Sequence, residues 1–173
     1  MPDLDGFNSA PPEELRPLLA ACLAVPRWVD AVLAGRPYAS VDELVAAGDR
    51  AAQLDDDEVL AAIAAHPRIG ERAAHDGVAA RWSAEEQSGA GAAADRLRAA
   101  NRAYEDRFGH GYLVCATGLS ADRVLVDLTS RLANSPEDEL RVANRELAAI
   151  AALRLRKALR PTTREGADRW ASS

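Results

Sequence analysis

The chain has few cysteine, lysine and aromatic residues. Of its 173 residues, two are cysteine, one is lysine and eight are aromatic. The cysteines, Cys22 and Cys115, are far apart and form no CxxC pair, which excludes a disulfide framework and a CxxC metal or redox motif. This cysteine usage indicates a reducing, cytoplasmic setting.

Long hydrophobic runs and an excess of positive charge are also missing. No segment approaches the 18 uninterrupted apolar residues of a membrane span, and residues 1–5 are acidic where a secretory signal is basic. The 27 acidic and 21 basic residues give a net charge of −6, the wrong sign for holding nucleic acid through its phosphates. We therefore expect a soluble, unexported protein that binds neither membranes nor nucleic acid.

Alanine is the most frequent residue, at 38 of 173 positions. Because alanine is the best helix former and aromatic strand formers are scarce, we expect an all-α fold. There is no repeat and no linker, which predicts a single domain over residues 1–173 with a core at 8–160 and a flexible tail at 161–173. Twenty of the 21 basic residues are arginine, a bias that fits GC-rich coding or bidentate anion binding.

Helix start and stop signals occur along the whole chain. We expect N-caps at Ser40, at Asp55 or Asp56, and at three further serines, and we expect Gly48 to fray or end its helix. A short apolar segment at 112–116 fits a buried strand or an extended loop equally well, and we favour the loop. The three further caps are Ser83, Ser120 and Ser135, and the predicted helices run over about 11–23, 26–35, 41–48, 56–66, 84–108, 121–132 and 136–159.

Three polar residues fall on the apolar faces of these helices. Burying such a group without a partner costs about 1–3 kcal/mol, so their placement is informative. Glu86 continues the apolar stripe of the long helix. Arg154 follows Leu147 by seven residues, which places it only about 20° away around the helix axis. His66 ends an apolar stripe just before Pro67, so an acid, a guanidinium and a base could converge.

Each of these residues also has a purely structural interpretation. Glu86 can complete the capping box of its own helix. Arg154 can pair with an acidic neighbour or lay its stem over apolar surface. His66 can be a satisfied core or helix C-terminal histidine. Taken singly, none of the three identifies a site.

Other site classes lack their motifs. There is no HxxxH or HExxH spacing, no GxSxG elbow and no glycine-rich phosphate loop between a strand and a helix. We therefore expect no metal site and no nucleophilic serine or cysteine. His75 and His110 lie in polar, glycine-flanked stretches, where we expect them to be solvated.

Several short motifs occur in a fixed order, and together they resemble those of one family. They are similar to the HPxxG, SxxEQ, aromatic-aliphatic, RLxN, E and LRL patterns of the 2-oxo-4-hydroxy-4-carboxy-5-ureidoimidazoline (OHCU) decarboxylases of urate degradation. The similarity spans roughly residues 8–160. The matching residues are His66-Pro67-Arg68-Ile69-Gly70, Ser83-Ala84-Glu85-Glu86-Gln87, Tyr112-Leu113-Val114-Cys115, Arg131-Leu132-Ala133-Asn134, Glu139 and Leu153-Arg154-Leu155.

The resemblance implies an all-α bundle of about eight to ten helices with one short extended segment near 112–117. It further implies a carboxy-lyase that converts OHCU to (S)-allantoin and CO₂ without a cofactor or metal, and that forms a homodimer. In these terms His66 is the catalytic acid/base, Glu86 orients the substrate hydroxyl or His66, and Arg154 holds a carboxylate or ureido oxygen. The resemblance places the remaining substrate contacts at Pro67, Ser83 and Gln87 and at backbone groups of Leu113, Val114, Cys115, Ala116 and Thr117.

The chain departs from the family pattern after its apolar segment. Thr117-Gly118-Leu119-Ser120 stands where the family commonly has a basic residue followed by G-[KR]-S, so two possible anion contacts are missing. Gly111-Tyr112 stands where many members have Pro-Phe. The changed 117–119 segment favours one alternative function, a helical module that binds a ureide or a protein partner. A metal-assisted hydrolase of cyclic amides is a separate alternative, which bound zinc would favour.

Overall fold

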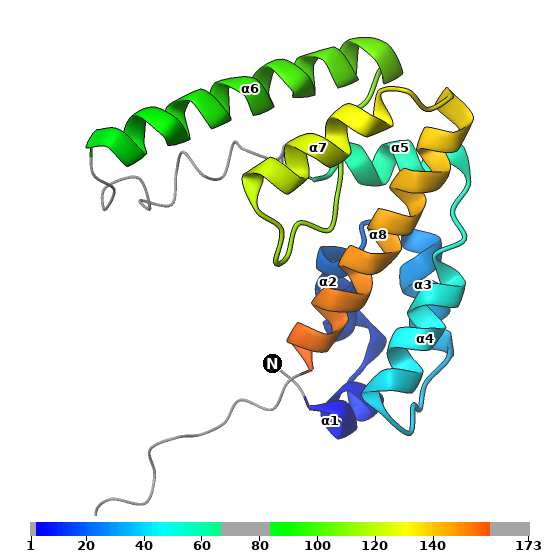
Figure 1. Cartoon of the computed structure of the whole chain (residues 1–173). Coiled ribbons are helices and arrows are strands. Elements are labelled where there is room, and N and C mark those ends of the chain that lie inside the picture. The colour runs from blue at the N-terminus through cyan, green and yellow to red at the C-terminus, as the bar shows by residue number, and fades with distance from the viewer. Residues whose placement is uncertain (1–2, 67–83, 160–173) are drawn as a thin grey trace, which may run out of the picture.

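The computed structural model describes residues 3–66 and 84–159, with side chains in the second range from residue 94 onward. The described residues form eight helices and no strand, which confirms the expected all-α fold (Figure 1). The predicted tail at 161–173 and the predicted cap Ser83 lie outside them. The helices are α1 (Leu4–Ser9), α2 (Pro12–Cys22), α3 (Pro26–Ala34), α4 (Val41–Ala51), α5 (Asp56–Ala64), α6 (Ala84–Phe108), α7 (Ala121–Arg131) and α8 (Pro136–Ala158).

The predicted N-caps are confirmed wherever they are described. The Ser40, Ser120 and Ser135 side chains each accept the amide hydrogen of the residue three positions later. Asp55, rather than Asp56, caps α5 and forms a full capping box with Glu58. These contacts lie within a few residues of each other, which is why the sequence alone locates the helix starts.

The expectation that Gly48 frays or ends its helix is wrong, because α4 continues to Ala51 with Gly48 buried inside it. The Trp28 indole nitrogen donates to the Gly48 carbonyl oxygen at 2.8 Å. A Cβ atom at Gly48 would lie 3.1 Å from Leu155 Cδ1 and 3.3 Å from Trp28 Cζ2. The close approach of α3 and α8, and not a helix end, thus favours glycine here, because a Cβ atom would make these side chains shift by a few tenths of an ångström. Helix α1 is a further element that the start signals did not predict.

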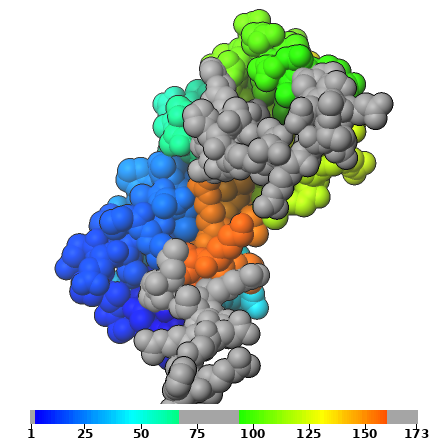
Figure 2. Space-filling model, turned by 90° about the vertical axis from the view of Figure 1, so that its left-hand side faces the viewer, coloured from blue at the N-terminus to red at the C-terminus, as the bar shows by residue number. Residues whose placement is uncertain are grey.

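Two groups of buried residues form the core. The larger group lies among α1–α5 and the length of α8, and the smaller one joins α6 to α7. Helix α8 runs from the end of the molecule that holds α6 and α7 down along α2 and α4 (Figure 1). In a view turned by 90°, α8 in orange lies between the N-terminal helices in blue and the green surface of α6 (Figure 2).

The segment 111–116 has neither helical nor strand structure, which agrees with the extended loop that we favoured. Glycines with positive φ flank it, Gly109 at +74° and Gly118 at +82°, a conformation that costs other residues strain. Its side chains alternate between the two cores, with Tyr112 and Val114 in the smaller group and Leu113 in the larger one. This alternation is typical of extended backbone. The segment therefore lies between the two groups of buried residues and packs against both.

Candidate active site

His66 follows the last turn of α5 and is half-buried. Its Nδ1 lies 2.7 Å from the carbonyl oxygen of Ala62. Because a carbonyl oxygen only accepts, Nδ1 carries the hydrogen of the neutral ring and Nε2 presents a lone pair. Nε2 is buried, and no described residue makes a hydrogen bond to it. The ring therefore holds an unused proton acceptor away from bulk water.

The surroundings of His66 keep this ring neutral. Burial lowers the pKa of His66 below its ordinary value of 6.5, the hydrogen bond to Ala62 opposes this shift, and the positive charge of Arg154 adds to it. The positive charge that acts on the imidazole thus comes from α8, whereas His66 follows the end of α5. A neutral histidine near physiological pH can serve as a general base.

Arg154 lies at the edge of the buried face of α8 rather than at its centre. The buried stripe continues through Leu147, Ala151 and Leu155, and Arg154 is half-buried beside it. Its Nη1 donates to the carbonyl oxygens of Ala21 at 2.9 Å and Cys22 at 3.3 Å. These carbonyls end α2, where a positive charge is favourable. The described contact of Arg154 is thus with the end of α2 and not with the acidic neighbour that we considered, and Nε and Nη2 have no hydrogen bond within the described residues.

The backbone of 113–117 is partly occupied by contacts within the protein. The Leu113 carbonyl oxygen accepts from Arg131 Nη1 at 2.9 Å, and the Cys115 amide donates to Glu146 Oε2 at 2.7 Å. The Ala116 carbonyl oxygen accepts from the Leu119 amide at 3.0 Å. Of the expected substrate contacts in this segment, three backbone groups are therefore already used, while the Ala116 and Thr117 side chains are exposed.

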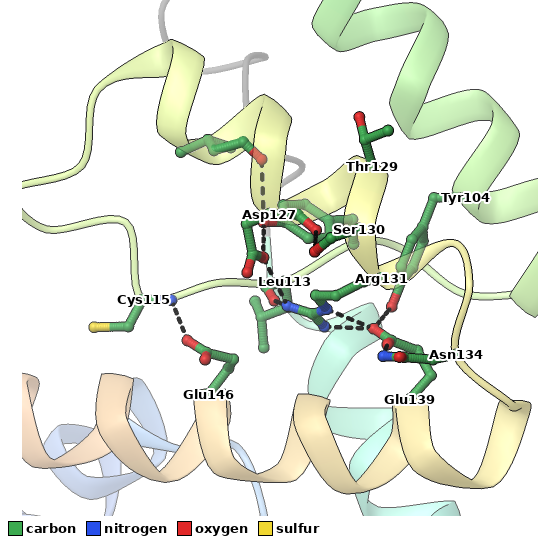
Figure 3. Close-up of polar contacts among 12 residues, drawn as sticks. Tyr104, Leu113, Cys115, Asp127, Thr129, Ser130, Arg131, Asn134, Glu139 and Glu146 are labelled. Carbon is green, nitrogen blue, oxygen red and sulfur yellow. Dashed lines mark hydrogen bonds and ion pairs between the residues drawn. The ribbon is translucent and has the colours of Figure 1, made fainter.

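A buried polar network lies behind this segment, between α6, α7 and α8 (Figure 3). Arg131 donates from Nε and Nη2 to Glu139 Oε1, at 2.8 and 2.5 Å. The Tyr104 hydroxyl donates to the same oxygen, and Asn134 Nδ2 donates to Glu139 Oε2 at 2.7 Å. Burial, followed by the contact with Glu139, raises the pKa of Tyr104, so its hydroxyl stays protonated.

A second tyrosine extends the network to the segment itself. The Tyr112 hydroxyl donates to Asp127 Oδ2 at 2.6 Å, and the Arg131 guanidinium carbon lies 4.8 Å from the centroid of the Tyr112 ring. Burial and then the bond to Asp127 raise the pKa of Tyr112. Arg131 is thus surrounded by two acidic groups, two aromatic rings and one carbonyl oxygen, which together satisfy a buried cation.

His66 also lines a cavity of about 330 Å³ between the end of α5 and the turn after α6. His110, which we expected to be solvated, lines this cavity. The His110 ring is half-buried and lies edge-on to Tyr104, with ring centroids 5.6 Å apart. Of the expected site residues whose side chains are described, only His66 borders this cavity. Its other described lining residues are Ile63, Ala64, Glu105, Gly109 and Gly111.

Four expected site residues have no described side chain. Pro67 and Ser83 lie outside the described residues, as does His75. Glu86 and Gln87 lie in the first turn of α6, where the structure describes the backbone but not the side chains. Their roles therefore stay predictions.

The described residues also bear on metal binding, on cysteine reactivity and on membrane insertion. Among the described residues, no group of three or more His, Cys, Asp or Glu side chains is arranged to hold a metal ion. Cys22 is buried, and burial raises the pKa of its thiol to about 11, which makes it a poor nucleophile. No helix in the described ranges is long and apolar enough to cross a bilayer.

Several residues behind the site have no role predicted from the sequence patterns. Arg131, Asn134 and Glu139 entered only as part of the family pattern, and Glu146 belongs to none of the motifs. Glu139, Glu146 and Arg154 follow each other at intervals of seven and eight residues, so they lie on one side of α8. Acidic residues at such intervals on a helix with apolar neighbours are the signal that could have identified them.

Comparisons with known proteins identify the family of this chain. The sequence model of the OHCU decarboxylase family matches residues 8–156. A 2-oxo-4-hydroxy-4-carboxy-5-ureidoimidazoline decarboxylase from Amia calva is 31% identical over 132 residues, covering 72% of this chain and 75% of that protein. A protein of the same name from Haloferax volcanii is also 31% identical over 132 residues, covering 74% and 79%.

Two solved structures share the fold. The structure of an OHCU decarboxylase in the presence of (S)-allantoin superposes with a TM-score of 0.67 at 24% identity, covering 87% of this chain and 99% of that one. The structure of an (S)-allantoin synthase has the same TM-score at 21% identity, covering 90% and 53%. With the family pattern matched along most of its length, the chain belongs to the OHCU decarboxylase family.

Proposed function

We propose that this protein decarboxylates OHCU to (S)-allantoin and CO₂ in urate catabolism, as a carboxy-lyase. Family membership supports the reaction. The single structural observation that carries it is the buried Nε2 lone pair of His66, a ring whose pKa is lowered by burial and by the positive charge of Arg154. A base and an anion-binding group are the two elements that this substrate requires.

The substrate itself supplies the electron sink. Its carboxylate is attached to a carbon that also bears a hydroxyl and adjoins a carbon doubly bonded to nitrogen. When the carbon–carboxylate bond breaks, CO₂ leaves and the electron pair moves into this unsaturated system. The nitrogen then takes a proton from water and an enol-like intermediate remains. The reaction thus needs proton transfer and positioning, and we propose that it proceeds without a cofactor.

His66 would act on the hydroxyl proton or protonate the intermediate. The tautomer set by Ala62 favours a ring that accepts a proton at Nε2 first. The same nitrogen can then return the proton to the intermediate. Return of the proton to one face of the carbon that bears the ureido group would give the S product.

Arg154 would hold a carboxylate or ureido oxygen of the substrate. Its Nη1 is fixed by the end of α2, so the remaining N–H groups of the planar fork are held in one orientation. Glu86 would orient the substrate hydroxyl or His66. We assign Pro67, Ser83, Gln87 and the unoccupied backbone groups of 113–117 to the outer part of the pocket, as the family pattern implies.

The cellular setting is part of the same proposal. Cysteine usage favours the cytoplasm, and the family resemblance favours a homodimer. We infer no nucleic-acid or membrane partner for a chain with a net charge of −6.

The proposal is tested with substrate generated in place from urate by urate oxidase and hydroxyisourate hydrolase. Circular dichroism of the product separates (S)-allantoin from the racemate that spontaneous decay gives. We expect the protein to speed the loss of substrate and to give the S enantiomer. Racemic product at the uncatalysed rate would reject the decarboxylase. Zinc-dependent hydrolysis of a cyclic amide, or tight ureide binding without turnover, would favour the two other functions considered.

A further inference from the structure

The two peptide groups on either side of Val114 are each held by a charged side chain. The carbonyl of the first peptide, from Leu113, accepts a hydrogen from Arg131. The amide of the second, from Cys115, donates to Glu146. Figure 3 shows the two side chains reaching the segment from different helices, Arg131 from α7 and Glu146 from α8. Because both neighbouring peptide planes are held, the two backbone dihedrals of Val114 are fixed.

The two contacts differ in their surroundings. Arg131 is buried and is itself held by Glu139, so it forms a rigid anchor whose removal disturbs the core. Glu146 is half-buried and has no ion-pair partner among the described residues, so its carboxylate can return to solvent if the contact is lost. The 2.7 Å hydrogen bond fixes the Cys115 amide without burying a charge pair in the core, and Glu146 is therefore a restraint on the segment that can be removed separately.

Helix α8 carries both this restraint and the proposed anion-binding residue. Glu146 and Arg154 are eight residues apart, about 12 Å along the helix axis. The hydrogen bond to Glu146 fixes the position of the backbone before Ala116 and Thr117 relative to α8, the helix that also carries Arg154. Small displacements of positioning groups reduce enzyme activity strongly. A fixed position of the 116–117 backbone relative to Arg154 is therefore important for activity.

We propose that Glu146 is a positioning residue of the decarboxylase site, which holds the Cys115 amide so that the backbone at 116–117 meets the substrate in a fixed geometry. This rests on the proposed function and adds a residue to it. The required property is a hydrogen-bond acceptor at the right reach. The negative charge is secondary.

Three variants separate these properties. Glu146→Gln keeps a carbonyl acceptor of the same length without the charge, Glu146→Asp keeps the charge but withdraws it by one carbon, and Glu146→Ala removes both. Glu137→Ala is the matched control, an exposed glutamate in the first turn of the same helix. KM and kcat are measured on freshly generated OHCU, and the affinity for (S)-allantoin is measured by calorimetry.

We expect Glu146→Ala and Glu146→Asp to raise KM and weaken (S)-allantoin binding by about tenfold. Glu146→Gln should stay within a few-fold of wild type, and Glu137→Ala should equal it. A loss of folded protein would instead lower kcat and leave KM unchanged. If Glu146→Ala does not fold, the comparison of the Asp and Gln variants decides the question.

Two results would overturn the inference while the wild-type protein remains active. One is an unchanged KM and product affinity in the Ala and Asp variants. The other is a Gln variant as impaired as the Ala variant, which would assign the effect to charge. An inactive wild-type protein would reject the proposed function instead, so the two failures are distinguishable.

Discussion

Arg131 and Glu139 form an ion pair that joins α7 to α8, with only 6% and 0% of their side-chain surfaces exposed. Two guanidinium nitrogens converge on one carboxylate oxygen, and Asn134 takes the other. Each charge of this buried pair compensates the other, because either charge alone would be buried without a partner.

Removing one partner of this pair should therefore destabilise the fold strongly. We expect Glu139→Leu or Arg131→Met alone to lower the free energy of unfolding by about 3–5 kcal/mol. The double variant should lose less than the sum of the two, because no lone charge remains. Urea unfolding of the four proteins gives the coupling energy, and simple additivity would show that the pair is not a coupled unit.

His66 should carry most of the catalytic rate. We expect His66→Ala to lower kcat by about 10²- to 10⁴-fold, the usual contribution of a general acid or base. His66→Asn is the closer control, because its amide nitrogen can keep the bond to Ala62 while it lacks a base at the Nε2 position. Stopped-flow rates for both variants test this, and an active Asn variant would contradict the proposed role.

The protonation of His66 should depend on Arg154. Burial, and then the positive charge of Arg154, lowers the pKa of His66 below 6.5, so the neutral base is lost only as the pH falls below that value. If His66 acts as a base, kcat/KM should fall on the acidic side with a midpoint below 6.5. Arg154→Gln removes the cation and should raise the pKa of His66, while the conservative Arg154→Lys should not. NMR titration of the His66 Cε1 proton measures this without activity, and an unmoved pKa in the Gln variant would refute the electrostatic link.

Arg154→Lys should weaken turnover although the charge is kept. Lysine has no planar fork, so it cannot use one nitrogen for the α2 carbonyl oxygens and present a second nitrogen to a substrate oxygen. We expect a raised KM on freshly generated OHCU with a small change in thermal stability. Full activity of the Lys variant would contradict a bidentate role and leave Arg154 with its structural contact to α2.

The sequence by itself located most of the helices and the position of His66 just after the end of α5. The caps at Ser40, Asp55, Ser120 and Ser135 are confirmed because each depends on atoms only a few residues apart. The same local logic placed His66 at the end of α5. Proline after it and apolar spacing before it are both visible in the one-dimensional pattern.

Only the tertiary structure decided how distant residues meet. Gly48 stays inside α4 because α3 and α8 pack against it, and no local signal predicts that approach. Arg154 lies at the edge of the core because it meets the end of α2, and Glu146 matters because an irregular segment 31 residues earlier passes beside α8. Helix propensity and capping are local, whereas the pairing of buried charges and backbone groups depends on how whole helices pack, which sequence spacing alone does not determine.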